Sequence, residues 1–256
     1  MRITLLPSHC THPEQLQPLT TFLVNGTVAI DAGCLGIALS LDQQRRIHHI
    51  IITHAHSDHT ATLPIFVAEV FPFLETPIVV HAIAPVIEAL RAHIFNDAIW
   101  PNFGQIPLLN GAGPALIYHG IETGIPFEVE GLRITMVQTN HTVPCAGLAV
   151  VEDEVTVLFT SDTHHTDDIW QLANRLDNLK AIFVDVSYPN ELENLAAAAK
   201  HLTPQSLDEE LHKLQQEIPI YAVHLKPQFH TQVSMELQRL NRKNVFVAEI
   251  GREYVW

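Results

Sequence analysis

The feature that most constrains this chain is a polar segment, His54-Ala55-His56-Ser57-Asp58-His59, that directly follows an apolar run. The run, residues 49–53, has the composition of a buried strand, and a helix is predicted over residues 60–71. Side chains alternate along an extended chain, so His54 and His56 can point to one side, and the turn can carry Asp58 and His59 to another. The fold must therefore accommodate three imidazoles and a carboxylate at the end of a buried strand.

Further candidate metal ligands recur where later predicted strands end. His141 follows the strand predicted over 132–139, Asp162 follows 155–160, and His224 follows 220–223. A solvated histidine-rich turn would explain the first segment alone, but it would not explain this repetition. Imidazole and carboxylate ligands without thiolate suit zinc, and they also suit manganese or iron.

The order of the predicted elements indicates two mixed sheets with helices outside. The first half has strands at 2–6, 21–24, 27–30, 49–53 and 78–80, with helices at 35–41, 60–71 and 85–94, and a long loop at 95–110. The second half has strands at 116–118, 127–129, 132–139, 146–151, 155–160, 181–184, 220–223 and 245–248, with helices at 167–174, 204–216 and 234–240. We expect a single domain, residues 1–256, of two similar halves, about 1–115 and 116–256.

The composition is that of a globular enzyme and disfavours long nucleic acids as partners. Apolar residues make up 47% of the chain and charged residues 16%, and the formal net charge is −14. Such a chain has no general basic surface for RNA or DNA. Bound divalent ions would make the potential positive locally, so a small anion can still bind there.

The cysteines and the apolar stretches indicate a cytoplasmic protein. Cys10, Cys34 and Cys145 are odd in number and lack CxxC spacing, which argues against a disulfide framework and a zinc knuckle. We identify no secretory signal and no apolar stretch of membrane-spanning length. We therefore expect a cytoplasmic location and no membrane partner.

The ligand candidates resemble, in order and type, those of the binuclear metallo-β-lactamase superfamily. The resemblance implies an α/β fold, the four-layer αββα sandwich, and two divalent ions, with zinc as the default. It implies that His54, His56 and His141 hold one ion, that Asp58, His59 and His224 hold the other, and that Asp162 bridges them. A water shared by two cations would become a hydroxide near neutral pH and attack the substrate.

Other stretches resemble one branch of that superfamily, the class II 3′,5′-cyclic-nucleotide phosphodiesterases. They are residues 93–97 with 99–101, residues 186–190, His201-Leu202-Thr203-Pro204 and His224-Leu225-Lys226-Pro227. The chain departs from the family pattern at Thr60-Ala61-Thr62-Leu63 and at His164-His165, which leaves the details of substrate specificity open. The resemblance implies a small anionic phosphodiester substrate, cyclic AMP or cyclic GMP, opened to the 5′-monophosphate.

Asp58, as a metal ligand, and His201 are the predicted catalytic residues. His201 precedes a predicted helix and resembles a histidine of ribonuclease Z, so we expect it to donate a proton to the leaving 3′ oxygen; the alternative is a surface histidine before a helix. In the loop 93–103, Asn96 and Trp100 are candidate substrate contacts together with His201, although ordinary packing explains these loop residues equally well.

Other functions remain open at this point. A ribonuclease Z-like RNA phosphodiesterase, a thioester or lactone hydrolase, and a metal-stabilised nucleotide sensor without catalysis would share the ligand set. Exposed apolar residues within 65–73 would allow a homodimer. The nucleotide base and the native metal are not specified by any motif.

Overall fold

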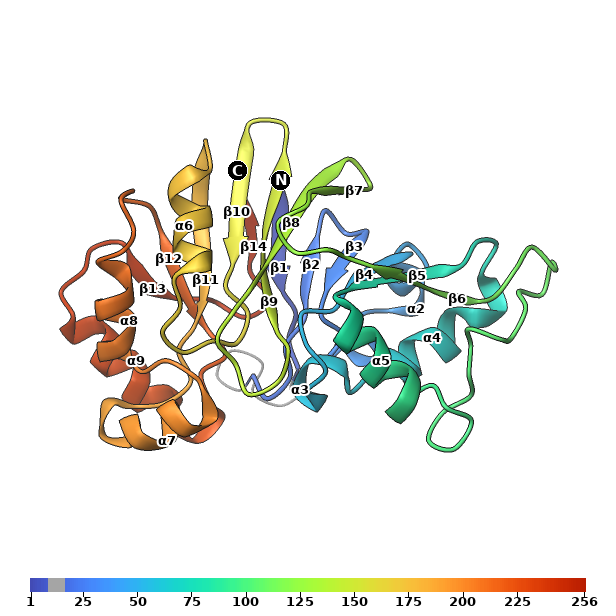
Figure 1. Ribbon diagram of the computed structural model, residues 1–256, viewed down its shortest axis with the longest axis horizontal. Helices are drawn as coiled ribbons and strands as arrows, with labels where there is room; N and C mark the ends of the chain where they lie inside the picture. The colour runs from blue at the N-terminus through green and yellow to red at the C-terminus, as the bar shows by residue number, and fades with distance from the viewer. Residues whose placement is uncertain (9–16) are drawn as a thin grey trace. The chain divides into compact units, whose positions relative to one another are not determined.

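The computed structural model describes residues 1–8 and 17–256, which divide into two compact units (Figure 1). The described part of unit 1 comprises residues 1–8, 19–122 and 251–255, and that of unit 2 comprises residues 17–18, 123–250 and 256. Each unit contains one seven-stranded sheet and its own helices. The single domain with halves near residue 115 stays a prediction, and Cys10 lies outside the described residues.

The sheet of unit 1 is antiparallel at one side and parallel at the other. Its order is β14 (Glu253–Val255), β1 (Arg2–Leu5), β2 (Phe22–Val24), β3 (Val28–Ile30), β4 (His49–Ile51), β5 (Ile78–Ala82) and β6 (Leu116–Gly120). The strands from β14 to β3 pair antiparallel, and those from β3 to β6 pair parallel. Its helices are α1 (Leu35–Ala38), α2 (Leu41–Gln44), α3 (Ser57–Thr60), α4 (Leu63–Val70), η1 (Phe71–Phe73) and α5 (Ala84–His93).

The sheet of unit 2 has the same mixed plan. Its order is β13 (Val245–Val247), β12 (Ile220–Val223), β11 (Leu179–Asp185), β10 (Val155–Phe159), β9 (Ala146–Glu152), β8 (Leu132–Gln138) and β7 (Phe127–Val129). The helical elements are α6 (Asp168–Arg175), η2 (Asn190–Leu192), α7 (Glu193–Ala199), α8 (Pro204–Leu211), η3 (Pro227–Phe229) and α9 (His230–Arg239). A buried apolar cluster that includes Trp170, Ile182, Leu207 and Leu237 joins α6, α8 and α9 to this sheet.

Strand direction in unit 2 brings four strand ends to one edge of the sheet. Strands β10, β11 and β12 are parallel, and both β8 and β10 pair antiparallel with β9. Strands β8, β10, β11 and β12 therefore all run the same way. In open α/β sheets the carboxyl ends of parallel strands are where ligands bind, so the residues that follow these strands form the candidate site of this unit.

Every predicted strand has a counterpart in the structure, but some bounds differ and some elements were not predicted. The helix predicted over 35–41 is shorter in the structure: α1 ends at Ala38, Leu39 is extended, and Ser40 caps the next helix by accepting a hydrogen bond from Gln43 N. The helix predicted over 60–71 corresponds to α4 followed by η1, with the separate short helix α3 before it, and the helix predicted over 204–216 ends at Leu211. Helix α7 and strand β14 were not predicted. Among the described residues no helix has the length and apolar character needed to cross a bilayer.

Candidate metal centre

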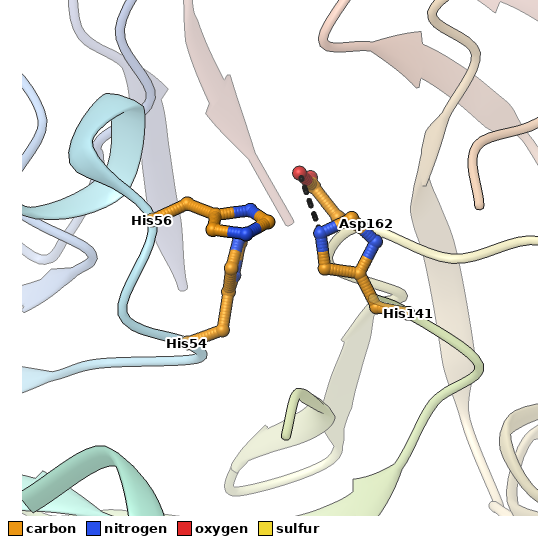
Figure 2. A group of neighbouring side chains, drawn as sticks. All are labelled: His54, His56, His141 and Asp162. Atoms are coloured by element: carbon orange, nitrogen blue, oxygen red, sulfur yellow. Dashed lines mark ion pairs between the residues drawn. The ribbon is translucent and has the colours of Figure 1, made fainter. Parts of the chain in front are cut away.

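In unit 1, the predicted ligands lie directly after β4, as the sequence indicates. His54 is fully buried, and its ring centroid lies 4.8 Å from that of His56 and 4.1 Å from that of His59. The short helix α3 begins after His56, so Asp58 and His59 lie on its single turn. His54 and His56, whose rings are drawn in Figure 2, each offer a ligand atom within 4.8 Å of the other, as do Asp58 and His59.

Asp31 fixes the orientation of His59, and the sequence analysis did not identify it. One carboxylate oxygen, Oδ2, lies 2.7 Å from His59 Nδ1, and the other accepts a hydrogen bond from Thr53 N at 2.8 Å. Because an ionised carboxylate only accepts hydrogen bonds, Nδ1 carries the proton and Nε2 keeps its lone pair for a metal. Asp31 follows β3, the parallel neighbour of β4, and this pairing explains the contact.

Gly33 allows the loop after β3 to approach the α3 turn closely. A Cβ atom at this position would lie 2.0 Å from Asp58 O and 2.7 Å from Thr20 N. Thr20 N donates to that same Asp58 carbonyl at 2.8 Å, and Ala32 N donates to His59 O at 2.7 Å. The backbone of the two ligands on α3 is therefore held by hydrogen bonds that a side chain at residue 33 would disrupt.

In unit 2, three predicted ligands converge at the shared edge of the sheet. Asp162 Oδ2 lies 3.9 Å from His141 Nε2, the ion pair dashed in Figure 2, and 3.6 Å from His224 Nε2. All three residues are buried. Asp162, His224, His201 and a fourth residue, Asp185, each offer a ligand atom within 4.8 Å of the others.

Asp185, the last residue of β11, links the predicted proton donor to a predicted metal ligand. Its Oδ2 lies 2.7 Å from His201 Nδ1, and its Oδ1 accepts a hydrogen bond from Ser187 Oγ at 2.7 Å. Ser187 Oγ also lies 2.9 Å from His224 Nδ1. Since the hydroxyl proton goes to Asp185, the hydroxyl oxygen accepts from His224, whose Nε2 keeps the lone pair that faces Asp162.

The carboxylates near His201 raise its pKa. Burial alone would lower the pKa of His201, but the charge and the hydrogen bond of Asp185, together with the charge of Asp162, raise it. His201 is 6% exposed, and its ring stacks on that of His224 with the centroids 5.3 Å apart. A buried imidazole whose Nδ1 contacts a carboxylate is a candidate general acid.

The donor set in each unit fits a divalent cation. The groups are imidazole nitrogens and carboxylate oxygens without thiolate, which suits zinc, manganese or iron. Cys34 and Cys145 are buried and carry free thiols, and burial raises the pKa of Cys34 to about 11. Thiolate ligation at Cys34 is therefore disfavoured.

The two predicted loop contacts have local roles in the structure. The Asn96 side chain donates to Ala92 O at 2.9 Å and accepts from Ala98 N and Ile99 N at 3.0 and 2.8 Å. The indole Nε1 of Trp100 is buried and has no hydrogen-bond partner among the described residues. A substrate contact of Asn96 would compete with three existing bonds, whereas Trp100 has a donor available; both roles stay predictions.

Comparison with known proteins assigns the chain to a family of known fold. The model of the β-lactamase superfamily domain matches residues 27–227. A curated relative from Yersinia pestis, described as a probable 3′,5′-cyclic-nucleotide phosphodiesterase, is 27% identical over 212 residues, which are 73% of this chain and 59% of the relative. The predicted resemblance is confirmed, and the match spans less than two thirds of that relative.

Solved structures of similar fold cover nearly the whole chain. Unliganded yeast PDE1 is 15% identical with a TM-score of 0.78, and the match covers 98% of both chains. The short form of human tRNase Z is 17% identical with a TM-score of 0.70, covering 100% of this chain and 99% of the other. At these identities the likeness shows the fold alone, and it confirms the predicted fold class.

Proposed function

Because this chain belongs to the metallo-β-lactamase superfamily and is a hydrolase of that family, we propose that it opens 3′,5′-cyclic nucleotides to 5′-monophosphates. The name of the curated relative supports this substrate class. The proposed substrate is a small anionic phosphodiester, either cyclic AMP or cyclic GMP. Nothing in the described loop contacts favours one base.

The proposed metal assignment follows the order of the motifs along the chain. In this assignment His54, His56 and His141 would hold one divalent ion, Asp58, His59 and His224 would hold the second, and Asp162 would be shared by both. Bound divalent ions supply a Lewis acid and lower the pKa of a bound water towards neutrality. The protein supplies the oriented lone pairs: Asp31 fixes the ring of His59, and Ser187 fixes that of His224.

The observation that carries the proposal is the buried pair formed by Asp185 and His201. A 3′ alkoxide is a poor leaving group, so its departure is accelerated when an acid protonates it, typically by about 10²- to 10⁴-fold. A thiolate leaving group requires no such acid, because a thiol ionises near pH 8.5. The buried contact of His201 with Asp185, which would support such an acid, therefore favours phosphodiester hydrolysis over thioester hydrolysis.

The other candidate functions have less support. Ribonuclease Z-like processing shares the fold, but a net charge of −14 opposes the binding of a long polyanion. A nucleotide sensor without catalysis would not require the buried pair of His201 and Asp185. A homodimer stays a proposal as well: Ile65 is 38% exposed and Phe73 is 45% exposed, as such an interface requires.

The test is hydrolysis by zinc- and manganese-loaded protein of cyclic AMP, cyclic GMP, a generic phosphodiester and a thioester. We expect cyclic-nucleotide turnover that yields the 5′-monophosphate, identified by ³¹P NMR, and that is lost in Asp162→Ala. His201→Gln should slow cyclic-nucleotide hydrolysis by about a hundredfold or more and affect thioester hydrolysis little. Turnover confined to the generic phosphodiester or the thioester would contradict the substrate class.

A further inference from the structure

Lys200 ends helix α7 in a backbone conformation that favours glycine. Its φ and ψ are both 55°, in the left-handed region. His201 N donates to Ala196 O at 2.9 Å, so the chain turns sharply out of the helix at this residue. Glycine is the usual residue at such helix ends because a side chain is strained there.

The same residue makes two reciprocal hydrogen bonds to His141. Its ammonium group Nζ donates to His141 O at 3.0 Å, and its carbonyl oxygen accepts from His141 Nδ1 at 3.1 Å. A carbonyl can only accept, so Nδ1 carries the proton and Nε2 is left with the lone pair that ligates a metal. Lys200 thus holds both the backbone and the ring of His141.

The left-handed turn also connects His141 to the predicted proton donor. His201 follows Lys200 directly, and its ring centroid lies 5.1 Å from that of His141. We propose that Lys200 is a positioning residue. Its ammonium group holds the backbone of His141, so that the His141 ring keeps its metal-binding orientation and its place beside the His201 ring. The inference rests on the proposed role of His141 as a metal ligand, and it does not depend on which substrate is hydrolysed.

If Lys200 only ended the helix, a different residue would be favoured at this position. If only the helix end mattered, glycine would serve better, because it adopts the left-handed conformation without strain. A strained lysine is accounted for when its side chain has a function that glycine lacks. The two roles are therefore separable by substitutions that change the strain and the ammonium group independently.

The test compares Lys200→Gly, Lys200→Met and Lys200→Arg in the full-length protein. Zinc affinity is measured by competition with a chelator, and the melting temperature of the metal-free protein by circular dichroism. We expect zinc affinity to fall about tenfold in both the Gly and Met variants, because the carbonyl behind the His141 ring remains while the hydrogen bond that holds the His141 backbone is lost, and to recover in the Arg variant. The Gly variant should melt at or above the wild-type temperature and the Met variant below it.

Matched controls separate the expected effect from general charge and strain. Asn241→Gly relieves another left-handed residue, with φ of 54°, and Lys243→Met removes an exposed ammonium group. Neither should change zinc affinity. The Nδ1 proton of His141, followed by ¹⁵N NMR in the metal-free protein, should exchange faster with water in Lys200→Met than in the wild type.

Three results would overturn the inference. Wild-type zinc affinity in Lys200→Gly and Lys200→Met would show that the ammonium group has no positioning role. Zinc affinity that follows melting temperature, low in the Met variant and unchanged in the Gly variant, would show a merely structural role. Absence of divalent-ion binding by the wild-type protein would overturn this inference together with the proposed function, whereas metal binding without cyclic-nucleotide turnover would contradict the substrate class alone.

Discussion

Two groups of histidines in this protein differ in the atoms that their ring nitrogens contact. The predicted metal ligands are supported by oxygen atoms: His59 by Asp31, His224 by Ser187, and His141 by the carbonyl of residue 200. On three adjacent strands of unit 1, His49, His81 and His119 contact one another instead. His81 Nε2 lies 3.0 Å from His49 Nδ1, and His81 Nδ1 lies 3.0 Å from His119 Nδ1.

The difference shows what a buried imidazole requires in order to bind a metal. A neutral ring has one donor and one acceptor nitrogen. An oxygen acceptor at Nδ1 takes up the donor and leaves Nε2 for a metal, whereas in the chain of three rings both nitrogens of His81 are engaged by neighbouring rings. Burial, followed by the charges of His49 and His119, lowers the pKa of His81 to about 3. We expect these three contacting histidines to stabilise the sheet and not to bind a metal.

The strongest test of the comparison replaces one buried histidine from each group. His59 and His81 are 1% and 4% exposed and both belong to unit 1, so they are matched in burial. His59→Gln removes a ligand, and we expect turnover and metal affinity to fall by more than the roughly hundredfold that a lost supporting partner costs. His81→Gln should retain both. Mass spectrometry measures the metal content of both variants, and steady-state kinetics measures their turnover. Equal losses of metal and turnover in the two variants would contradict the distinction between the two groups of histidines.

The second prediction concerns the two carboxylates behind the ligands. Asp31→Asn weakens the support of a metal ligand alone, so we expect a roughly 10- to 100-fold lower metal affinity and turnover that recovers in excess metal. Asp185→Asn also weakens the support of His201, so turnover should stay low when the metal site is saturated. Metal titrations of activity separate the two variants, and recovery of Asp185→Asn to wild-type turnover would contradict the role of His201.

The smallest predicted effect is on acid stability. The folded pKa of His81 lies below its unfolded value, so the unfolded chain binds more protons as the pH falls below about 6.5. Stability linked to His81 is therefore present at neutral pH and lost towards pH 3. Between pH 7 and pH 5 the free energy of unfolding should fall by up to roughly 2 kcal/mol less in His81→Leu than in the wild type. One proton changes this free energy by about 1.4 kcal/mol per pH unit. Urea denaturation at pH 7 and pH 5 measures it, with exposed His93→Leu as the control.

The position of the candidate metal ligands at strand ends was predictable because its signal is local in sequence. Each of His54, His141, Asp162 and His224 follows an apolar run, and the strand period alone places such residues at a sheet edge. Asp31 and Asp185 gave no such signal, since each acts on a residue of another strand or loop. Their roles depend on strand pairing, such as Ile30 with Ile51 and Asp185 with Val223, and on the hydrogen bond through Ser187.

The bounds of helices were less predictable for a related reason. The largely apolar composition of residues 35–41 favours a single helix, but the capping box of Ser40 and Gln43 begins a second helix there. Lys200 gave no sequence signal either, because a lysine after four alanines is an ordinary helical residue. Its left-handed conformation follows from the contacts of His141 and His201, which lie far apart in the chain.

The left-handed backbone at the strand ends limits how this protein can be stabilised. Asp31 and His224 have φ of 60° and 63°, and each has a proposed role in the metal centre that depends on its side chain. Replacing such residues by glycine relieves strain of roughly 1 kcal/mol or more and removes a functional group. Directed evolution for heat resistance would thus select against activity at these two positions. Asp153, with φ of 50° in the turn between β9 and β10, offers the same gain in stability without that conflict.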